Sequence, residues 1–277
     1  MSAAAPSAGL IEELRGRLEQ AGVLPRGGPR SAPDPAVLAE RCEADPRALA
    51  AVIDHTLLRP EVTGTDVAAL CDEANQHRFA SVCVNPLWVP TCALKVEPPV
   101  RVCTVVGFPL GANDPAVKAD EAAMAVAAGA HELDMVLAIG LLREAAPTDG
   151  ALDRERLALV FEDIQGVVLA AREAEGPVLL QERRIKVILE TGLLDMRQKV
   201  LGALLALAAG AHFVKTSTGF SNAGATVDDV ALLRAVVGGS AGVKASGGIR
   251  DRATALALLR AGADRLGCST SVALLGG

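Results

Sequence analysis

The 277-residue sequence has no tyrosine, and its aromatic side chains (five Phe and one Trp) make up only 2% of the chain. Half of the residues are nevertheless hydrophobic, so the chain can bury a large core built mainly of alanine, valine and leucine. Such a core suits helices packed on a parallel sheet, and the composition argues against disorder.

The chain also lacks any basic run, and its formal net charge is −6. This charge disfavours nucleic acid and anionic membranes as partners. The longest uncharged apolar stretch, residues 200–214, is too short to span a bilayer and contains two glycines and a histidine. The N-terminus lacks the basic start and long apolar stretch of a signal peptide. We therefore expect a cytoplasmic protein.

Metal-binding and redox motifs are missing as well. The six cysteines form no CxxC pair, and the four histidines form no HExxH motif or Cys/His cluster. In a chain of this length, scattered cysteines indicate reduced and mostly buried thiols. We expect neither a metal nor a cofactor.

From residue 50 onward, short apolar runs alternate with amphipathic helical segments. This alternation predicts parallel strands joined by right-handed helical crossovers, and eight such strands indicate an α/β fold of the TIM (β/α)8 barrel type. The expected strands are 51–54, 80–84, 100–106, 132–137, 185–190, 212–216, 242–246 and 265–268. The expected helices between them are 65–78, 115–129, 152–175, 195–210, 226–237 and 251–262.

The N-terminal part is the least determined. A helical pattern over 9–21 leads into a linker rich in Pro and Gly, and a helix is expected at about 35–44. We interpret residues 1–35 as a partly helical or flexible extension without assigned chemistry, and residues 36–277 as one catalytic barrel domain.

An internal repeat supports a closed barrel. The phrases AAGAHELD, AAGAHFVK and RAGADRLG each end a helix with glycine, a common C-cap, and enter a strand three residues later. Aligning them places Asp134, Lys215 and Gly267 at one register, on alternate strands. Alternate strands of a barrel contribute to the same interior layer, so Asp134 and Lys215 should point into one layer.

Two lysines occur in near-copies of one phrase, VKTSTG for Lys215 and VKASGG for Lys244. Lysine is rare here, with six against 21 arginines, and both phrases place it at the carboxyl end of a strand, where α/β barrels keep their catalytic residues. A Schiff-base lysine needs a pKa far below its ordinary value of about 10.4, and a second cation together with partial desolvation lowers it. Spacing alone does not decide which lysine is the nucleophile and which is the cation.

Nearby carboxylates have both catalytic and structural interpretations. Asp134 is a candidate general acid/base acting through water, or else the partner of a structural ion pair. Asp54 is expected at the end of the first strand, where it would orient a lysine, bind a substrate hydroxyl or cap the next segment. Lys186 and Glu190 alternate onto one face of the fifth strand, so an interior ion pair between them is as plausible as catalysis.

Loops after the last strands are candidates for phosphate binding. TSTGF, ASGGIR and GCSTS are rich in small residues and precede helical segments, whose N-termini favour anions. Barrels often bind phosphate after strands seven and eight. The candidate residues are Gly247, Gly248, Ser269 and Thr270, and the alternative is that these loops are only tight turns.

Seven phrases together resemble deoxyribose-phosphate aldolase: IDHTLLRPEVT, SVCVNP, VVGFPLGAN, ELDMV, KVILETGLL, VKTSTGF and VKASGGIR, in this order over about residues 50–275. The resemblance implies a metal-independent class I aldolase that reversibly cleaves 2-deoxy-D-ribose 5-phosphate to D-glyceraldehyde 3-phosphate and acetaldehyde, in deoxyribonucleoside catabolism. It assigns the Schiff base to Lys215, the perturbing cation to Lys244 and proton transfer to Asp134. Further substrate contacts are expected from Asp54, Cys83, Thr218, Gly219 and the four phosphate candidates, and family habit suggests a homodimer.

Three departures from the family pattern stand out. FSNAGAT replaces a more glycine-rich version, and GCSTS replaces the commoner pair of serines. No tyrosine is present to assist proton transfer, as a C-terminal tyrosine does in some members. Two rival hypotheses are another Schiff-base barrel enzyme, which a substrate panel would distinguish, and a catalytically silent phosphosugar-binding barrel, which borohydride would not trap.

Overall fold

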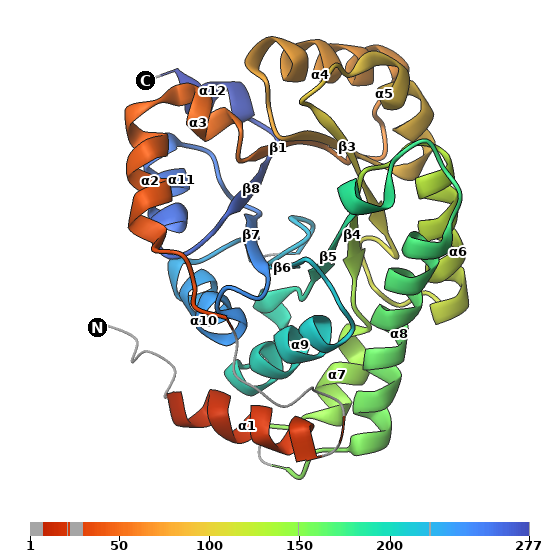
Figure 1. The fold of residues 1–277 in the computed structure, drawn as a ribbon, viewed down its shortest axis with the longest axis vertical. Coiled ribbons are helices and arrows are strands. Elements are labelled where there is room, and N and C mark those ends of the chain that lie inside the picture. Colours follow the sequence, from red (N-terminus) through yellow and green to blue (C-terminus); the bar gives the residue numbers. More distant parts are fainter. Residues whose placement is uncertain (1–7, 21, 23–29, 149, 222, 277) are drawn as a thin grey trace.

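The computed structural model describes residues 8–20, 22, 30–148, 150–221 and 223–276. Eight parallel strands pair in chain order, and the last pairs with the first to close a barrel (Figure 1). The predicted TIM barrel is thus confirmed. The strands are β1 (Ile53–Leu57), β2 (Ser81–Val84), β3 (Arg101–Val106), β4 (Glu132–Val136), β5 (Arg184–Ile188), β6 (Phe213–Lys215), β7 (Gly242–Ser246) and β8 (Arg265–Cys268).

Helices join the strands and cover the outside of the barrel (Figure 1). Asp and Thr N-caps start most of the long ones, and Thr63 and Asp195 form capping boxes with Asp66 and Gln198. Among the described residues, no helix has both the length and the apolar character needed to cross a membrane. The helices are α4 (Gly64–His77), α5 (Val89–Lys95), α6 (Pro115–Ala127), α7 (Ile139–Ala145), α8 (Arg154–Glu173), α9 (Met196–Ala208), α10 (Val227–Val237), α11 (Arg252–Arg260) and α12 (Ser271–Leu275).

Three helices precede the barrel: α1 (Ala8–Gln20), α2 (Pro35–Ala44) and α3 (Pro46–Ala50). The first lies along α9, where it buries Leu14 and Leu18, and Arg15 donates a hydrogen bond to the Val236 carbonyl at 3.0 Å (Figure 1). The helix expected over 9–21 is therefore present, although residue 21 and part of the linker lie outside the described residues. The division into an extension and a barrel domain stays a prediction.

Two differences from the expected elements affect the site. β1 starts two residues later than expected and continues to Leu57, because Ala51 ends α3 instead of starting the strand. Asp54 is therefore the second residue of its strand and not its end. Short helices such as α5 and α7 were not expected, since seven residues are too few to show a clear helical period.

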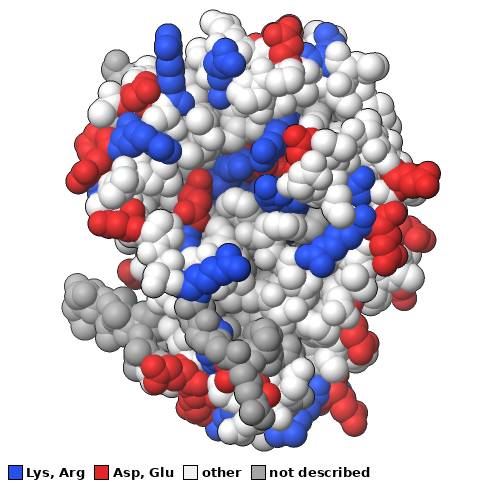
Figure 2. Space-filling view, in the orientation of Figure 1, with Lys and Arg blue, Asp and Glu red and all other residues white. Residues whose placement is uncertain are grey.

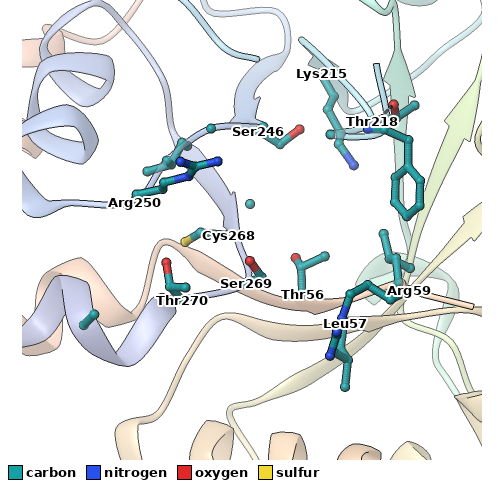
Figure 3. A pocket seen from close by; sticks show the side chains of 18 residues that line it. Thr56, Leu57, Arg59, Lys215, Thr218, Ser246, Arg250, Cys268, Ser269 and Thr270 are labelled. Atoms are coloured by element: carbon teal, nitrogen blue, oxygen red, sulfur yellow. Dashed lines mark hydrogen bonds between the residues drawn. The ribbon is translucent and has the colours of Figure 1, made fainter. Parts of the chain in front are cut away.

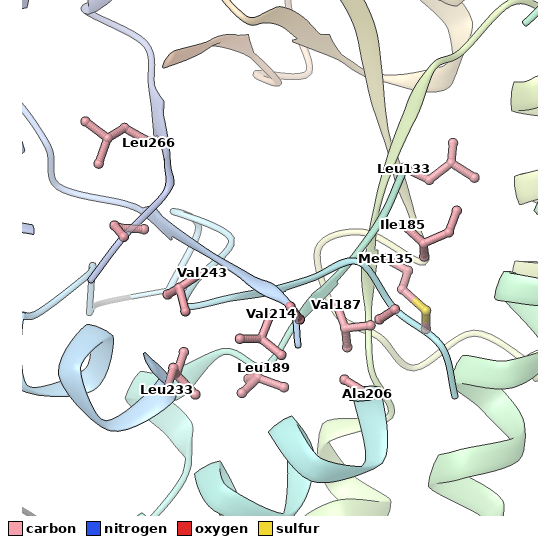
Figure 4. Close-up of a cluster of buried hydrophobic side chains, with 14 of the residues drawn as sticks. Leu133, Met135, Ile185, Val187, Leu189, Ala206, Val214, Leu233, Val243 and Leu266 are labelled. Atoms are coloured by element: carbon pink, nitrogen blue, oxygen red, sulfur yellow. The ribbon is translucent and has the colours of Figure 1, made fainter. Parts of the chain in front are cut away.

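Alternation along each strand separates an apolar outside from a polar inside. Leu133 and Met135 of β4 face the helices, whereas Glu132 and Asp134 face the barrel axis. Outward residues of β5, β6 and β7 pack in the same way against Ala206 of α9 and other aliphatic side chains (Figure 4). The interior of the barrel is thus free to hold charged groups at its centre.

The histidines of the two AAGAH phrases have a shared structural role. His131 Nδ1 accepts a hydrogen bond from Val102 N at 3.3 Å, and His212 Nδ1 accepts one from Ile185 N at 3.1 Å. Burial and neighbouring arginines lower the pKa of both imidazoles. Protonation at Nδ1 would replace the acceptor with a donor and break these bonds, so the folded state requires neutral rings.

We expect the free energy of unfolding to fall as the pH drops from 7 to 5. The folded-state pKa of both histidines lies below the ordinary value of about 6.5, so in this range the unfolded chain binds more protons than the folded one. Calorimetry at a series of pH values should show a melting temperature that declines by a few degrees in this range, well before the carboxylates titrate. A His131→Gln/His212→Gln variant keeps an acceptor without titrating and should show a shallower decline. An equal slope in that variant would contradict the assignment.

Candidate active site

A layer of charged side chains fills the barrel interior. Asp54 of β1, Glu132 and Asp134 of β4, Lys186 of β5 and Lys244 of β7 are all fully buried. Charges so far from water require partners, and every one of these groups has one. The layer is closed by Lys215 of β6 and Arg265 of β8.

Asp134 is the hub of this layer. Its Oδ1 accepts a hydrogen bond from Lys186 Nζ at 2.8 Å, and its Oδ2 accepts from both Lys215 Nζ and Lys244 Nζ at 2.7 Å. Burial alone would raise the pKa of Asp134, but the three neighbouring lysine side chains lower it well below its ordinary value. The contact with Lys215 confirms that these two side chains meet inside the barrel. Asp134 is therefore an ionised carboxylate shared by three lysines.

Lys244 and Lys215 differ in their counter-ions. Lys244 contacts Asp54 as well as Asp134, and although burial alone would lower the pKa of Lys244, these two carboxylates raise it above its ordinary value. Lys215 pairs with Asp134 alone among the described residues. Both nitrogens touch the same oxygen, so they lie no farther apart than twice 2.7 Å. Lys244 is thus a fixed cation close to the Lys215 amine.

The charges of the layer balance if one amine is neutral. Three carboxylates (Asp54, Glu132 and Asp134) face four cationic side chains (Lys186, Lys215, Lys244 and Arg265). Arg101 also reaches Glu132, but its side chain is 37% exposed and is partly neutralised by solvent. A surplus buried charge is costly, and Lys215 has the fewest carboxylate partners of the three lysines.

A cavity of about 580 Å³ opens above this layer. Lys215 lines the cavity, whereas Asp134, Lys244 and Asp54 do not. In Figure 3, Lys215 extends into the cavity beside Ser246, with Ser269 and Arg250 on the facing loops. Figure 2 shows basic side chains gathered near the middle of the face, with a few acidic side chains beside them. The expected substrate-binding residues that line the cavity are Thr218, Gly219, Gly247, Gly248, Ser269 and Thr270.

Glycines shape the cavity wall. Gly247 and Gly248 have φ angles of +90° and +77°, which other residues rarely adopt. A Cβ on Gly224 would meet the Gly247 carbonyl oxygen at 2.4 Å, so the loops after β6 and β7 pack backbone against backbone. A Cβ on Gly267 would meet Lys244 Cε at 3.1 Å, so the third residue of the aligned register makes room for a lysine.

Two expected substrate contacts lie elsewhere. Asp54 sits beneath the cavity, where its Oδ1 accepts from Ser81 Oγ at 2.7 Å and contacts Arg265, so it caps no helix but does hold Lys244. Cys83 is fully buried in a small cluster with Cys103 and lines no part of the cavity. Both belong to the support below the site.

Lys186 and Glu190 do not form an ion pair with each other, which was one of the two alternatives that the sequence left open. Lys186 binds Glu132 at 2.6 Å and Asp134 at 2.8 Å. Glu190 lies beyond the end of β5 with a φ angle of +59°, which turns its side chain toward the loop after β6. The alternation of side chains along β5 does not apply to Glu190, because β5 ends at Ile188.

Several residues that line the cavity were not expected from the sequence. Arg250 and Arg59 are the last residues of the phrases ASGGIR and IDHTLLR. Their position shortly after a strand could have identified them as residues that line the cavity. Thr56 lies two residues after Asp54 on the inner face of β1, and only the correct bounds of that strand reveal it. Phe220 packs edge-on against Phe108 from another loop, a contact without a sequence signal.

Other reactive groups of the site are already engaged. The ligand atoms of Cys83, Cys103 and Asp134 lie within 4.8 Å of one another, a spacing compatible with a metal ion. A metal there would compete with the three lysine nitrogens that contact Asp134. Burial raises the pKa of Cys268, which lines the cavity, to about 11, so this thiol is protonated at neutral pH. Lys215 also lines the cavity.

Two proteins of known family are about half identical to this chain over most of its length. No family model matches the chain. It is 51% identical over 233 residues to a deoxyribose-phosphate aldolase from Halalkalibacterium halodurans, covering 83% of this chain and 96% of that one. It is 50% identical over 230 residues to deoxyribose-phosphate aldolase 1 from Bacillus licheniformis, covering 83% and 95%.

Two solved structures are similar over most of their length. A putative deoxyribose-phosphate aldolase from Coccidioides immitis matches with a TM-score of 0.75 and 35% identity, covering 96% of each chain. The deoxyribose phosphate aldolase from Aeropyrum pernix, described as tetrameric, matches with a TM-score of 0.74 and 34% identity, covering 88% of this chain and 97% of that one.

Proposed function

This chain belongs to the deoxyribose-phosphate aldolase family, and we propose that Lys215 is the residue through which it attacks its substrate. The enzyme is an aldolase that cleaves 2-deoxy-D-ribose 5-phosphate. One observation carries the assignment: Lys215 alone of the three lysines on Asp134 lines the cavity, and it has the fewest carboxylate partners. Neutral Lys215 also balances the buried charges.

Lys244 and Asp134 prepare the nucleophile. Two carboxylates hold Lys244 in its charged form, and this fixed charge disfavours a second positive charge on the neighbouring amine. Asp134 contacts the Lys215 nitrogen directly, so it can accept or return a proton there. The two groups act on Lys215 in different ways, although Lys244 and Lys215 lie in near-identical sequence phrases.

The reaction follows from these roles. Neutral Lys215 attacks the C1 aldehyde of the open-chain sugar, and loss of water, assisted by Asp134, gives an iminium ion. The C3 hydroxyl then loses its proton through water to Asp134 as the C2–C3 bond breaks, which releases D-glyceraldehyde 3-phosphate. The bonding electrons form an enamine on Lys215. Protonation at C2 and hydrolysis release acetaldehyde and free the lysine.

The substrate phosphate is assigned to the far side of the cavity. Gly247 and Gly248 present backbone there, Ser269 and Thr270 add hydroxyl groups, and Arg250 supplies a positive charge. If the phosphate binds at these loops, C1 of the open-chain sugar can extend toward Lys215. The wall is neutral or positive, which suits a phosphosugar in a chain of net negative charge.

Borohydride trapping tests the assignment. We expect incubation with 2-deoxyribose 5-phosphate and borohydride to abolish activity and to add the mass of the reduced adduct to the peptide that contains Lys215. The exposed Lys95, measured in the same digest, serves as the internal control. Label on Lys244 would show that the two roles are reversed. Absence of label would favour a barrel that binds phosphosugars without catalysis.

Three further features remain predictions. A homodimer and a place in deoxyribonucleoside catabolism are expected from the family resemblance, and a cytoplasmic location is expected from the sequence composition. Size-exclusion chromatography with light scattering would measure the assembly state.

A further inference from the structure

Glu190 is a buried carboxylate for which the mechanism has no role. It lies just beyond β5, is 2% exposed and does not line the cavity. Its φ of +59° and ψ of +61° place it in the left-handed region, where a residue other than glycine is strained. Among the described residues, no cationic side chain lies within ion-pair distance of it. A strained residue that buries an unpaired carboxylate is costly to retain, so its contacts point to function.

Among the described residues, the hydrogen bonds of the Glu190 side chain all go to the loop after β6. Its Oε2 accepts from Thr218 N at 3.1 Å and from the Thr218 hydroxyl, and its Oε1 accepts from the Ser221 hydroxyl at 2.9 Å. The Thr218 hydroxyl in turn accepts from Phe220 N at 3.0 Å. One carboxylate therefore sets the path of residues 218–221.

This loop forms one wall of the cavity. Thr218, Gly219 and Phe220 line it, and the loop rests on the glycines proposed to bind phosphate. Ala225 N donates to the Gly247 carbonyl at 3.0 Å, and a Cβ on Gly219 would lie 3.8 Å from Gly247 Cα. Glu190 thus supports, from behind, the wall against which the phosphate loop packs.

The adjacent backbone holds Lys215 without help from the Glu190 side chain. Leu189 N donates to the Lys215 carbonyl at 3.0 Å, and Thr191 N donates to the Thr216 carbonyl at 2.9 Å. Loss of the carboxylate should leave these two bonds intact. The effect of Glu190 should therefore fall on the loop and not on the nucleophile.

We propose that Glu190 is a positioning residue that fixes loop 218–221 and, through it, the phosphate-binding geometry of the cavity. This inference rests on the proposed function. It also reassigns Thr218: both of its donors are directed to Glu190, so its polar atoms shape the wall and do not bind the substrate.

The test compares phosphorylated with unphosphorylated substrate. For Glu190→Ala we expect the KM for 2-deoxyribose 5-phosphate to rise about tenfold or more, with kcat within about threefold of wild type, because a loosened wall costs binding geometry. The kcat/KM for 2-deoxyribose, which has no phosphate to place, should change less than about threefold. Glu190→Gln keeps an acceptor for Thr218 and can donate to Ser221, so it should restore most of the affinity.

Two further variants distinguish the effect of losing the carboxylate from the effects of relieved backbone strain and of poor folding. Glu190→Gly relieves the positive φ but lacks the carboxylate, and it should match Glu190→Ala in KM even if the alanine variant folds poorly. Ser221→Ala removes one of the three hydrogen bonds to Glu190 without touching the cavity and should give an intermediate KM.

Several outcomes would overturn the proposal. Equal losses on both substrates, or a fall in kcat with unchanged KM, would mean that Glu190 acts on the chemistry. A lower melting temperature with both kinetic constants unchanged would mean that it only stabilises the fold. If the wild-type enzyme neither cleaved 2-deoxyribose 5-phosphate nor trapped it on Lys215, the proposed function would fail instead.

Discussion

Replacing Lys215 with alanine is expected to lower kcat/KM by about 10⁴-fold or more, because no other group can form the covalent intermediate. The fold should survive. Lys215 is the amine proposed to be neutral in the buried layer, so its loss leaves three carboxylates facing Lys186, Lys244 and Arg265. Steady-state cleavage of 2-deoxyribose 5-phosphate, together with the melting temperature, measures both effects.

Matched lysine variants make this prediction specific. Lys95→Ala removes an exposed lysine that does not line the cavity and should change neither activity nor stability. Lys244→Met also removes an amine from Asp134, but it takes a required cation from Asp54, so it should lower the melting temperature as well as kcat. If Lys215→Ala kept a tenth of the activity, or if it destabilised the fold more than Lys244→Met, the assignment of roles would be wrong.

Replacing Asp134 with asparagine is expected to impair both catalysis and folding. The amide keeps the shape of the side chain but cannot take a proton from Lys215 or neutralise Lys186 and Lys244. Removing one partner from a buried ionic network typically costs about 3–5 kcal/mol. Proton transfer by a positioned group contributes about 10²–10⁴-fold to the rate. Urea unfolding and initial rates measure the two losses separately.

A double variant separates the two roles of Asp134. Asp134→Asn/Lys244→Met removes one charge of each sign and restores the balance of the layer. It should recover much of the stability lost in Asp134→Asn while remaining inactive. Recovery of activity would argue against Asp134 as the proton carrier, and no recovery of stability would argue against the charge balance.

The sequence by itself determined the architecture. Alternating strand and helix patterns are local, so they can be recognised in a single sequence. The repeated phrase that ends a helix and enters the next strand indicated the closed barrel. It also identified Asp134, Lys215 and Lys244, because each lies in a short phrase at a fixed place on its strand. The family resemblance then supplied their roles.

Only the tertiary structure decided how these side chains pair. The internal repeat predicted that Asp134 and Lys215, 81 residues apart, share a layer, but no local pattern predicted that Lys186 contacts the same carboxylate. The start of β1 was misplaced because alanine and valine suit both the end of a helix and the start of a strand. Of the alternatives left open for Asp54, the structure selected its contact with a lysine, Lys244. Strand alternation predicted the wrong direction for the Glu190 side chain, because this residue lies beyond the end of β5 with a positive φ. Side chains buried together in one interior layer must balance their charges, and that condition applies to the folded chain as a whole.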